Sequence, residues 1–238
     1  MGTPWSKQWL SRWGALLAFA AALLLPQPAG KAQESSVDLA LVLAVDCSFS
    51  VDAVEFRLQM EGLGQAFFRP EIKKAIRAGY RQRIAVIVMQ WSDEGNQMVV
   101  LPWTIIAGDA DADEVGQVLS RMPRRLAEGG TSISTALAYG HGLFASGPEA
   151  ERRVIDVSSD GRNNIGPPVD AARDRVVAAG VTINGLVILN EWPTLDVYFE
   201  DQVAGGEGHF VISANNYEAY GEAIFRKLLK EITGPGIS

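Results

Sequence analysis

The stretch Val45-Asp46-Cys47-Ser48-Phe49-Ser50 places oxygen-bearing side chains at alternate positions, directly after the mostly apolar run 37–44. In an extended segment alternate residues face the same way, so Asp46, Ser48 and Ser50 can converge on one point. Carboxylate and hydroxyl oxygens are hard donors, which suit Mg²⁺, or Mn²⁺ or Ca²⁺, better than zinc or copper. The stretch therefore suggests a site for a hard divalent cation, although taken alone it fits an Asx turn and helix cap equally well.

Two later segments carry donors of the same kind. Thr131 lies in "EGGTSIST", just before a predicted helix, and Ser158, Ser159 and Asp160 come at the end of a predicted strand in "DVSSDGRNN". Each segment alone fits a helix cap or a turn. All three, in order and each at a strand exit or helix start, predict one metal site. Its residues are Asp46, Ser48, Ser50, Thr131 and Asp160, and Gly129, Gly130 and Gly161 allow the loops to approach it closely.

The composition of this set has a chemical consequence. Three hydroxyls and two carboxylates cannot fill six positions without water, and Mg²⁺ usually keeps several waters. With neutral hydroxyls on the cation and the carboxylates further out, the open position stays electron-poor. Such a site would bind an acidic group from a partner.

The elements that must position these residues follow an alternating pattern of β-rich runs and amphipathic stretches, which predicts a mostly parallel sheet covered by helices. Only "SDEGN" separates runs 83–91 and 97–104, so these two strands should form an antiparallel hairpin. Pro102 favours the sheet edge for the second of them. The prediction is an α/β fold with six strands, five parallel and one antiparallel at the edge: 37–46, 83–91, 97–104, 152–160, 181–189 and 208–213.

Helices are expected between these strands. Asp52, with Glu55 three residues later, is a plausible start for the first helix, and Gly147 and Gly180 stand where helix C-caps would fall. Apolar residues recur at helical spacing in three segments: Phe56, Met60, Leu63 and Phe67; Val169, Ala172 and Val176; Tyr217, Tyr220, Ile224 and Leu228.

Residues 1–32 have the features of an export signal. Lys7 and Arg12 precede the apolar run 14–25, and Gly30-Lys31-Ala32 offers small residues for cleavage. The apolar run is too short to span a bilayer comfortably, and no second one follows, so no stable membrane insertion is expected. We therefore expect a periplasmic or secreted protein whose single domain comprises residues 33–238.

Charge and cysteine content exclude some partners. The net charge of −7 becomes −10 without residues 1–32, and no basic cluster is present to follow phosphates, so neither nucleic acid nor an anionic lipid surface is expected. Cys47 is the only cysteine, which rules out an intramolecular disulfide. A small buried residue is a better interpretation of Cys47 than a nucleophile.

Other chemical features favour structural interpretations. "GDADADE" imitates a calcium loop at Asp109, but Glu114 stands where glycine is required, so the start of a solvated helix is expected. His141 and His209 have no metal-ligand partner at useful spacing, and no nucleotide-binding motif occurs. Four aromatic residues are expected to pack, with exposed ones near the metal site as possible partner contacts: Trp103, Trp192, Tyr198 and Phe199.

The residues of the predicted metal site resemble the motif of a known family. Asp46-x-Ser48-x-Ser50, Thr131 and Asp160-Gly161 look like the metal-ion-dependent adhesion site (MIDAS) of von Willebrand factor A (vWA) domains, and the resemblance covers about residues 37–233. It implies a three-layer, Rossmann-like fold. A narrower resemblance, to short exported bacterial vWA-like proteins of a domain-of-unknown-function family, is carried by "LAVDCSFSVD", "SDGRNN" and the tail from Tyr198 to Ile232.

The resemblance also implies a role for each residue. Ser48 and Ser50 would coordinate Mg²⁺ directly, Thr131 directly or through water, and Asp46 and Asp160 mainly through waters. The usual role in that family is to hold a protein ligand through a Glu or Asp that completes the metal shell. No catalysis is implied, so the protein is not expected to be an enzyme.

One enzyme remains as an alternative, a magnesium-dependent phosphohydrolase with Asp46 as nucleophile. That chemistry usually needs a second acid nearby and a lysine to neutralise the phosphate. Ser48 stands at the position of the acid, and no lysine lies near Thr131 or Asp160 in the sequence. A serine hydrolase is also disfavoured, because no G-x-S-x-G segment occurs.

Overall fold

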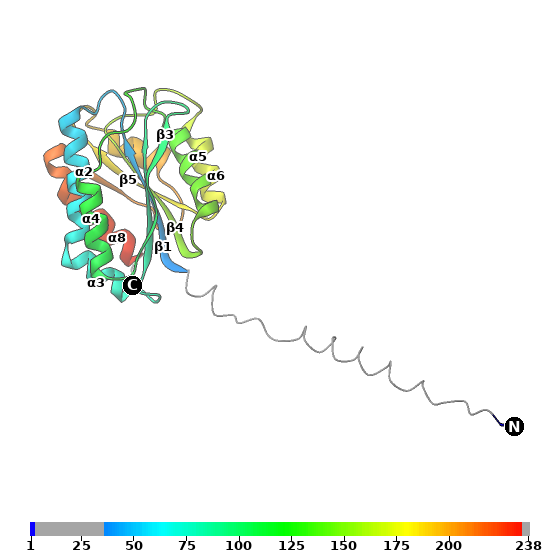
Figure 1. The fold of residues 1–238 in the computed structure, drawn as a ribbon. Helices are drawn as coiled ribbons and strands as arrows, with labels where there is room; N and C mark the ends of the chain where they lie inside the picture. Colours follow the sequence, from blue (N-terminus) through cyan, green and yellow to red (C-terminus); the bar gives the residue numbers. More distant parts are fainter. Residues whose placement is uncertain (3–35, 235–238) are drawn as a thin grey trace. The chain divides into compact units, whose positions relative to one another are not determined.

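A six-stranded sheet forms the centre of the protein (Figure 1). The computed structural model describes residues 1–2 and 36–234, so nearly all of the expected export signal lies outside the described residues. The strand order is β3-β2-β1-β4-β5-β6, with β3 antiparallel to β2 and the other pairs parallel, as predicted. The strands are β1 (Val37–Asp46), β2 (Ile84–Trp91), β3 (Gln97–Ile106), β4 (Ala150–Ser159), β5 (Thr182–Ile188) and β6 (Val211–Ala214).

Strand β1 lies between β2 and β4 and is buried along its whole length. Its side chains alternate between two hydrophobic cores: Leu41 and Leu43 belong to one, and Val42 and Ala44 to the other. This alternation follows from the two-residue period of a strand. A strand covered on both faces needs apolar residues at nearly every position, which explains the continuous run in the sequence.

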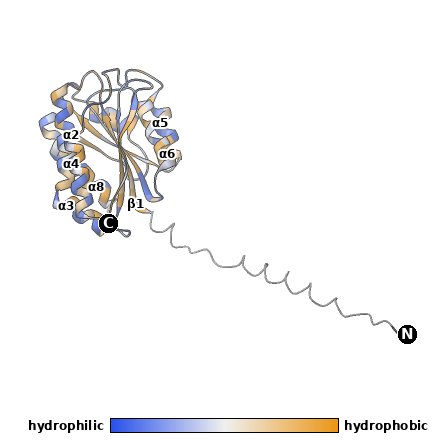
Figure 2. Ribbon diagram, viewed as in Figure 1, coloured by the Kyte–Doolittle hydropathy of each residue, from blue (hydrophilic) through white to orange (hydrophobic). Residues whose placement is uncertain are grey.

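Helices cover both faces of the sheet (Figure 1). On one side lie α2 (Ala53–Phe68), α3 (Pro70–Ala78), α4 (Asp109–Ser120) and α8 (Tyr220–Thr233); on the other lie α5 (Ile133–Leu143) and α6 (Val169–Ala178). Shorter elements connect them: η1 (Phe144–Ser146), α7 (Leu195–Tyr198), η2 (Phe199–Val203) and η3 (Tyr217–Ala219). Hydrophobic residues run along the strands, and hydrophilic ones are concentrated on the helices (Figure 2).

The first helix begins as the sequence predicts. The Asp52 carboxylate accepts hydrogen bonds from the backbone N–H groups of Val54 and Glu55, and the Glu55 side chain accepts one from the Asp52 N–H. This reciprocal arrangement satisfies donors that the first turn would leave unpaired. It fixes where α2 starts, with six residues between it and the end of β1.

The edge strand β3 carries features that discourage pairing with another chain. Its pairing with β2 is irregular around Val86 and Val88, and Pro102 lies within it. Proline cannot donate to a neighbouring strand, and a bulge twists an edge away from partners. The predicted hairpin and the edge position of Pro102 are both confirmed.

Two predicted details need correction. The last strand begins at Val211 rather than Gly208, so His209 lies before it, where its Nδ1 is 2.8 Å from the Gly206 carbonyl oxygen. Tyr217 belongs to the short turn η3, not to the regular part of the last helix. Gly147 stands at the C-cap of η1, as predicted, with φ of −83°, so left-handed backbone is not the reason for a glycine. A Cβ there would come within 2.9 Å of the Trp103 ring, which accounts for the glycine.

Among the described residues, no helix combines the length and the apolar character needed to span a membrane.

Candidate metal centre

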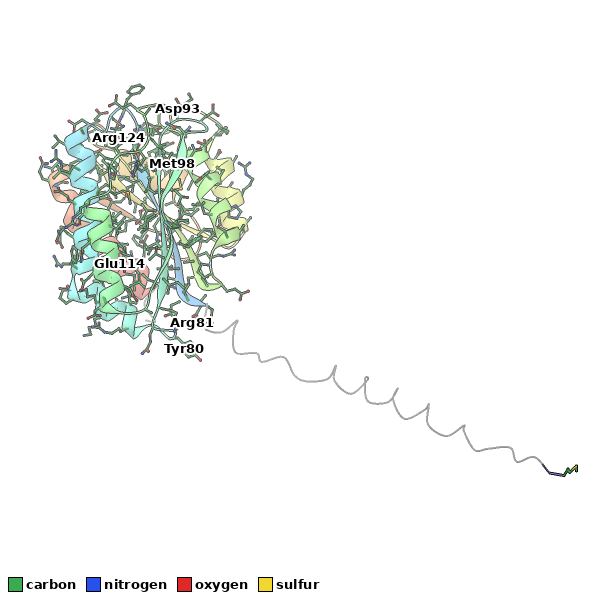
Figure 3. The ribbon with its side chains drawn as sticks, viewed as in Figure 1. Tyr80, Arg81, Asp93, Met98, Glu114 and Arg124 are labelled. Atoms are coloured by element: carbon green, nitrogen blue, oxygen red, sulfur yellow. The ribbon has the colours of Figure 1, made fainter. Side chains whose placement is uncertain are left out.

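The topology brings the carboxyl ends of β1 and β4 together. These strands are parallel neighbours, and Val45 pairs with Ser158, so Asp46 lies beside the exit of β4. Polar residues that are more than 100 positions apart in the sequence thereby meet at one edge of the sheet. Figure 3 shows Asp93 and Arg124 at this end of the molecule, and Tyr80 and Arg81 at the opposite end.

The loop after β1 is held in a tight polar turn. The Ser48 N–H donates to Asp46 Oδ1 at 2.7 Å, which is an Asx-type turn. The hydroxyl oxygens of Ser48 and Ser50 lie 3.1 Å apart, and Ser50 Oγ donates to Asp160 Oδ1 at 2.7 Å. The turn and the cluster therefore coexist: the turn interpretation is correct locally, and it also brings the hydroxyls to Asp160.

Asp46 is completely buried. Besides the bond from Ser48, its Oδ2 accepts a hydrogen bond of 2.5 Å from the Ser159 hydroxyl. Burial, followed by the nearby charge of Asp160, raises the pKa of Asp46 to about 7. Asp160 is also completely buried, so two carboxylates lie close together in a region with little access to water.

Thr131 reaches the same place from the loop before α5. Its N–H donates to Asn164 Oδ1 at 2.8 Å, and the Asn164 N–H donates back to the Thr131 carbonyl at 2.9 Å. A Cβ at position 161 would lie 3.4 Å from Thr131 Oγ1, so Gly161 lets the two loops come close. Thr131, Ser50 and Gly161 line one open depression of about 590 Å³.

The residues fit a hard cation on two grounds. In the part of the chain that the structure describes, neither Asp46 nor Asp160 has a lysine, arginine or histidine nitrogen within 4.0 Å. Two buried carboxylates without a countercharge are costly, and a divalent cation would offset that cost. Over residues 36–234, no three His, Cys, Asp or Glu side chains form a metal cage, so a cation here would depend on the hydroxyls.

Four residues that complete this arrangement were not assigned to it from the sequence. Ser159 binds Asp46, Tyr217 donates to Asp160 Oδ2 at 2.9 Å, and Asn164 holds Thr131. The fourth is Arg124, whose guanidinium donates to the carbonyls of Cys47, Ser48 and Val51. The "SDGRNN" segment contains a signal for Ser159 and Asn164. Tyr217 was assigned to a helical stripe, and nothing in the spacing of Arg124 indicates its target.

The features expected to be structural can now be placed. Cys47 is buried, and burial raises the pKa of its thiol to about 12, as suits an inert packing residue. Asp109 begins α4, as expected for "GDADADE". Phe199 packs in the core, whereas Trp192 is 46% exposed on the rim of the depression, so the packing prediction is wrong for Trp192.

Searches against solved structures return vWA domains. Proximal thread matrix protein 1 from the mussel byssus matches with a TM-score of 0.62 at 16% identity, over 84% of this chain and 49% of that one. A second form of that protein has a zinc-occupied MIDAS motif. The vWA protein from Catenulispora acidiphila matches with a TM-score of 0.56 at 18% identity, over 82% and 43% of the two chains.

A bacterial pilus protein matches over nearly its full length. The vWF domain of the pilus tip protein Mfa5 from Porphyromonas gingivalis has a TM-score of 0.54 at 12% identity, over 85% of this chain and 98% of that one. By contrast, this chain spans about half the length of the mussel protein. Comparison with curated proteins gives no match. The fold is therefore that of a vWA domain, and because a family model matches residues 36–236, the chain belongs to the family described as "Protein of unknown function (DUF1194)".

Proposed function

We propose that this protein is an exported binding module that holds Mg²⁺ at Asp46, Ser48, Ser50, Thr131 and Asp160, and recognises an acidic group on a protein partner. The observation that carries the proposal is the pair of buried carboxylates, Asp46 and Asp160, which are joined to serine hydroxyls and have no cationic side chain within 4.0 Å among the described residues. An export signal and periplasmic or secreted location are part of the proposal. Pilus and byssus proteins support it through their similar fold; their sequence identity to this chain is 12–16%, which shows the fold alone.

The placement of the carboxylates supports hydroxyl coordination of the metal. Both oxygens of Asp46 accept hydrogen bonds from within the chain, and Asp160 accepts one at each oxygen, from Ser50 and Tyr217. Carboxylates held this way orient the hydroxyls that would coordinate the cation, and they add negative charge near it without coordinating it directly. Ser50 and Thr131 line the open depression, where an acidic side chain of a partner can reach the cation.

The phosphohydrolase alternative is less well supported. A carboxylate nucleophile must reach a substrate, whereas Asp46 is completely buried and fully engaged in hydrogen bonds. A phosphatase assay on wild type and Asp46→Asn tests this directly. Turnover that disappears in the variant would replace the binding module with an enzyme.

Metal-dependent thermal shift and titration calorimetry test the metal assignment. We expect Mg²⁺ to raise the melting temperature of the wild type and to leave a Ser48→Ala/Asp160→Ala variant unchanged. Ser146→Ala is the control, because the Ser146 hydroxyl in η1 donates to the Leu143 carbonyl and contacts none of the five site residues. Equal metal responses in wild type and the double variant would reject the assignment, and Mn²⁺, Ca²⁺ and Zn²⁺ in the same assay rank the metals.

Partner binding needs its own measurement. A pull-down from envelope extract with Mg²⁺ or with EDTA, using wild type and the double variant, identifies proteins whose capture depends on the metal. We expect capture only by the wild type in Mg²⁺. A partner retained equally in EDTA would show that recognition does not involve the cation.

A further inference from the structure

Arg162 lines the same depression as Ser50 and Thr131. Its guanidinium lies 5.1 Å from the ring centre of Trp192 and 5.4 Å from that of Tyr198, and Nη2 donates to Thr194 Oγ1 at 2.9 Å. These contacts hold the charge in place, because stacking on aromatic rings and a hydrogen bond together restrict a long side chain. Arg162 is thus a fixed cation beside the candidate metal site.

The donors of this guanidinium are largely unused. Its Nε is buried without a hydrogen-bond partner, and among the described residues no carboxylate lies within 4.0 Å of it. A guanidinium matches a carboxylate with two parallel hydrogen bonds, so an arginine held in this way is suited to bind a planar anion. The described residues do not supply that anion.

We propose that Arg162 is a second recognition point, so that the partner segment presents two carboxylates, one to the metal and one to Arg162. This rests on the proposed function, because the first carboxylate is the one at the cation. Arg162 follows Asp160 by two residues and lines the depression that Ser50 and Thr131 also line, so both recognition points open onto the same surface. In an extended peptide, residues i and i+2 face the same way and lie about 7 Å apart. An acidic residue, any residue, and a second acidic residue is therefore the shortest extended segment that presents two carboxylates on the same side.

Glu191 should weaken the preference for a second acidic residue. It is exposed and lines the same depression, so its charge opposes a second acidic group. Removing that charge in Glu191→Gln should strengthen binding of a doubly acidic segment by about two- to fivefold, as expected for exposed charges. The same change should hardly affect a segment whose second residue is neutral.

Three capped pentapeptides test the inference by titration in Mg²⁺: Gly-Asp-Gly-Asp-Gly, Gly-Asp-Gly-Asn-Gly and Gly-Asp-Gly-Lys-Gly. For wild type we expect the second Asp to give about tenfold tighter binding than Asn, and Lys to bind most weakly. Arg162→Gln should remove the difference between the Asp and Asn peptides and leave affinity for the Asn peptide unchanged. Arg121→Gln, which removes an exposed arginine elsewhere, should keep the wild-type order.

The outcomes separate this inference from the function on which it rests. Equal affinity of wild type for the Asp and Asn peptides, or an equal gain in Arg162→Gln, would overturn the role of Arg162 while leaving the metal site standing. Failure of all three peptides to bind in Mg²⁺ would overturn both proposals. Binding that is identical in EDTA would remove the metal from the function, and the comparison of Arg162→Gln with wild type would still decide the second contact.

Discussion

The hydroxyl of Tyr217 donates a 2.9 Å hydrogen bond to Oδ2 of Asp160, across 57 positions of sequence. Tyr217 lies in η3, which leads directly into α8, and it is 3% exposed. Burial, together with the charge of Asp160, raises the pKa of Tyr217, so its hydroxyl keeps the proton that it donates. The start of the last helix is therefore tied to a residue of the candidate metal site.

Tyr217→Phe tests how much this bond contributes. Losing a hydrogen bond to a buried carboxylate should lower the free energy of unfolding by about 1.5–3 kcal/mol in EDTA, and should weaken Mg²⁺ binding about tenfold or more, because a carboxylate near the metal loses its orienting partner. Urea unfolding and calorimetry measure the two effects. Tyr80→Phe is the control, because Tyr80 is 87% exposed at the far end of the molecule (Figure 3). Unchanged metal affinity in Tyr217→Phe would show that Asp160 does not depend on this hydroxyl.

Arg124 offers a test of the loop that carries the serines. Its guanidinium donates to three carbonyls of that loop, those of Cys47, Ser48 and Val51. Arg124→Lys should lower Mg²⁺ affinity several-fold despite its retained charge, because an ammonium cannot reproduce the planar fork of donors. The neighbouring Arg125 is exposed, and Arg125→Lys should bind Mg²⁺ like the wild type. Equal affinities for all three proteins would assign Arg124 a role in stability alone.

Gly185, within β5, is a position where packing rather than chain flexibility requires glycine. A Cβ there would lie 2.7 Å from Phe199 Cδ1 and 3.3 Å from Val211 Cγ2. Gly185→Ala should lower the free energy of unfolding by about 1–3 kcal/mol, the usual cost of overpacking. Gly142→Ala, in α5 with open space around it, should instead raise it by up to about 1 kcal/mol. Urea unfolding of both variants checks the opposite signs, and a neutral Gly185→Ala would show that Phe199 moves aside freely.

Local patterns in the sequence predict the elements of the fold, but not the long-range contacts that support the site. The positions of the strands, the edge hairpin and the first helix follow from local patterns: apolar runs, a five-residue connection and the Asp52–Glu55 cap. The chemical character of the site could also be predicted, because its residues stand at two strand exits and one helix start. The supporting contacts of Tyr217 and Arg124 could not, because each joins segments that are 57 to 77 positions apart, and local spacing carries no information about such pairs.

Lys227, Asp156 and Glu231 form a buried ion cluster. Lys227 Nζ lies 2.6 Å from Asp156 Oδ2 and 2.7 Å from Glu231 Oε1, and all three side chains are almost completely buried. One ammonium thus faces two carboxylates. Burial raises the pKa of Asp156 from its ordinary value of 3.8 to about 7; Lys227 lowers it and Glu231 raises it again.

The sign of the resulting pH dependence follows from proton linkage. Between about pH 4 and 7 the folded chain keeps a proton on Asp156 that the unfolded chain releases, so this group stabilises the fold at low pH and its contribution is lost as pH rises through 7. In urea unfolding in EDTA from pH 5 to 8, the free energy of unfolding should therefore fall less with rising pH for Asp156→Asn than for wild type. Glu231→Gln should move the decline to lower pH, because it removes a charge that raises the pKa of Asp156. Parallel curves for wild type and Asp156→Asn would mean that Asp156 is already ionised at pH 5, with Lys227 sufficient to hold its charge.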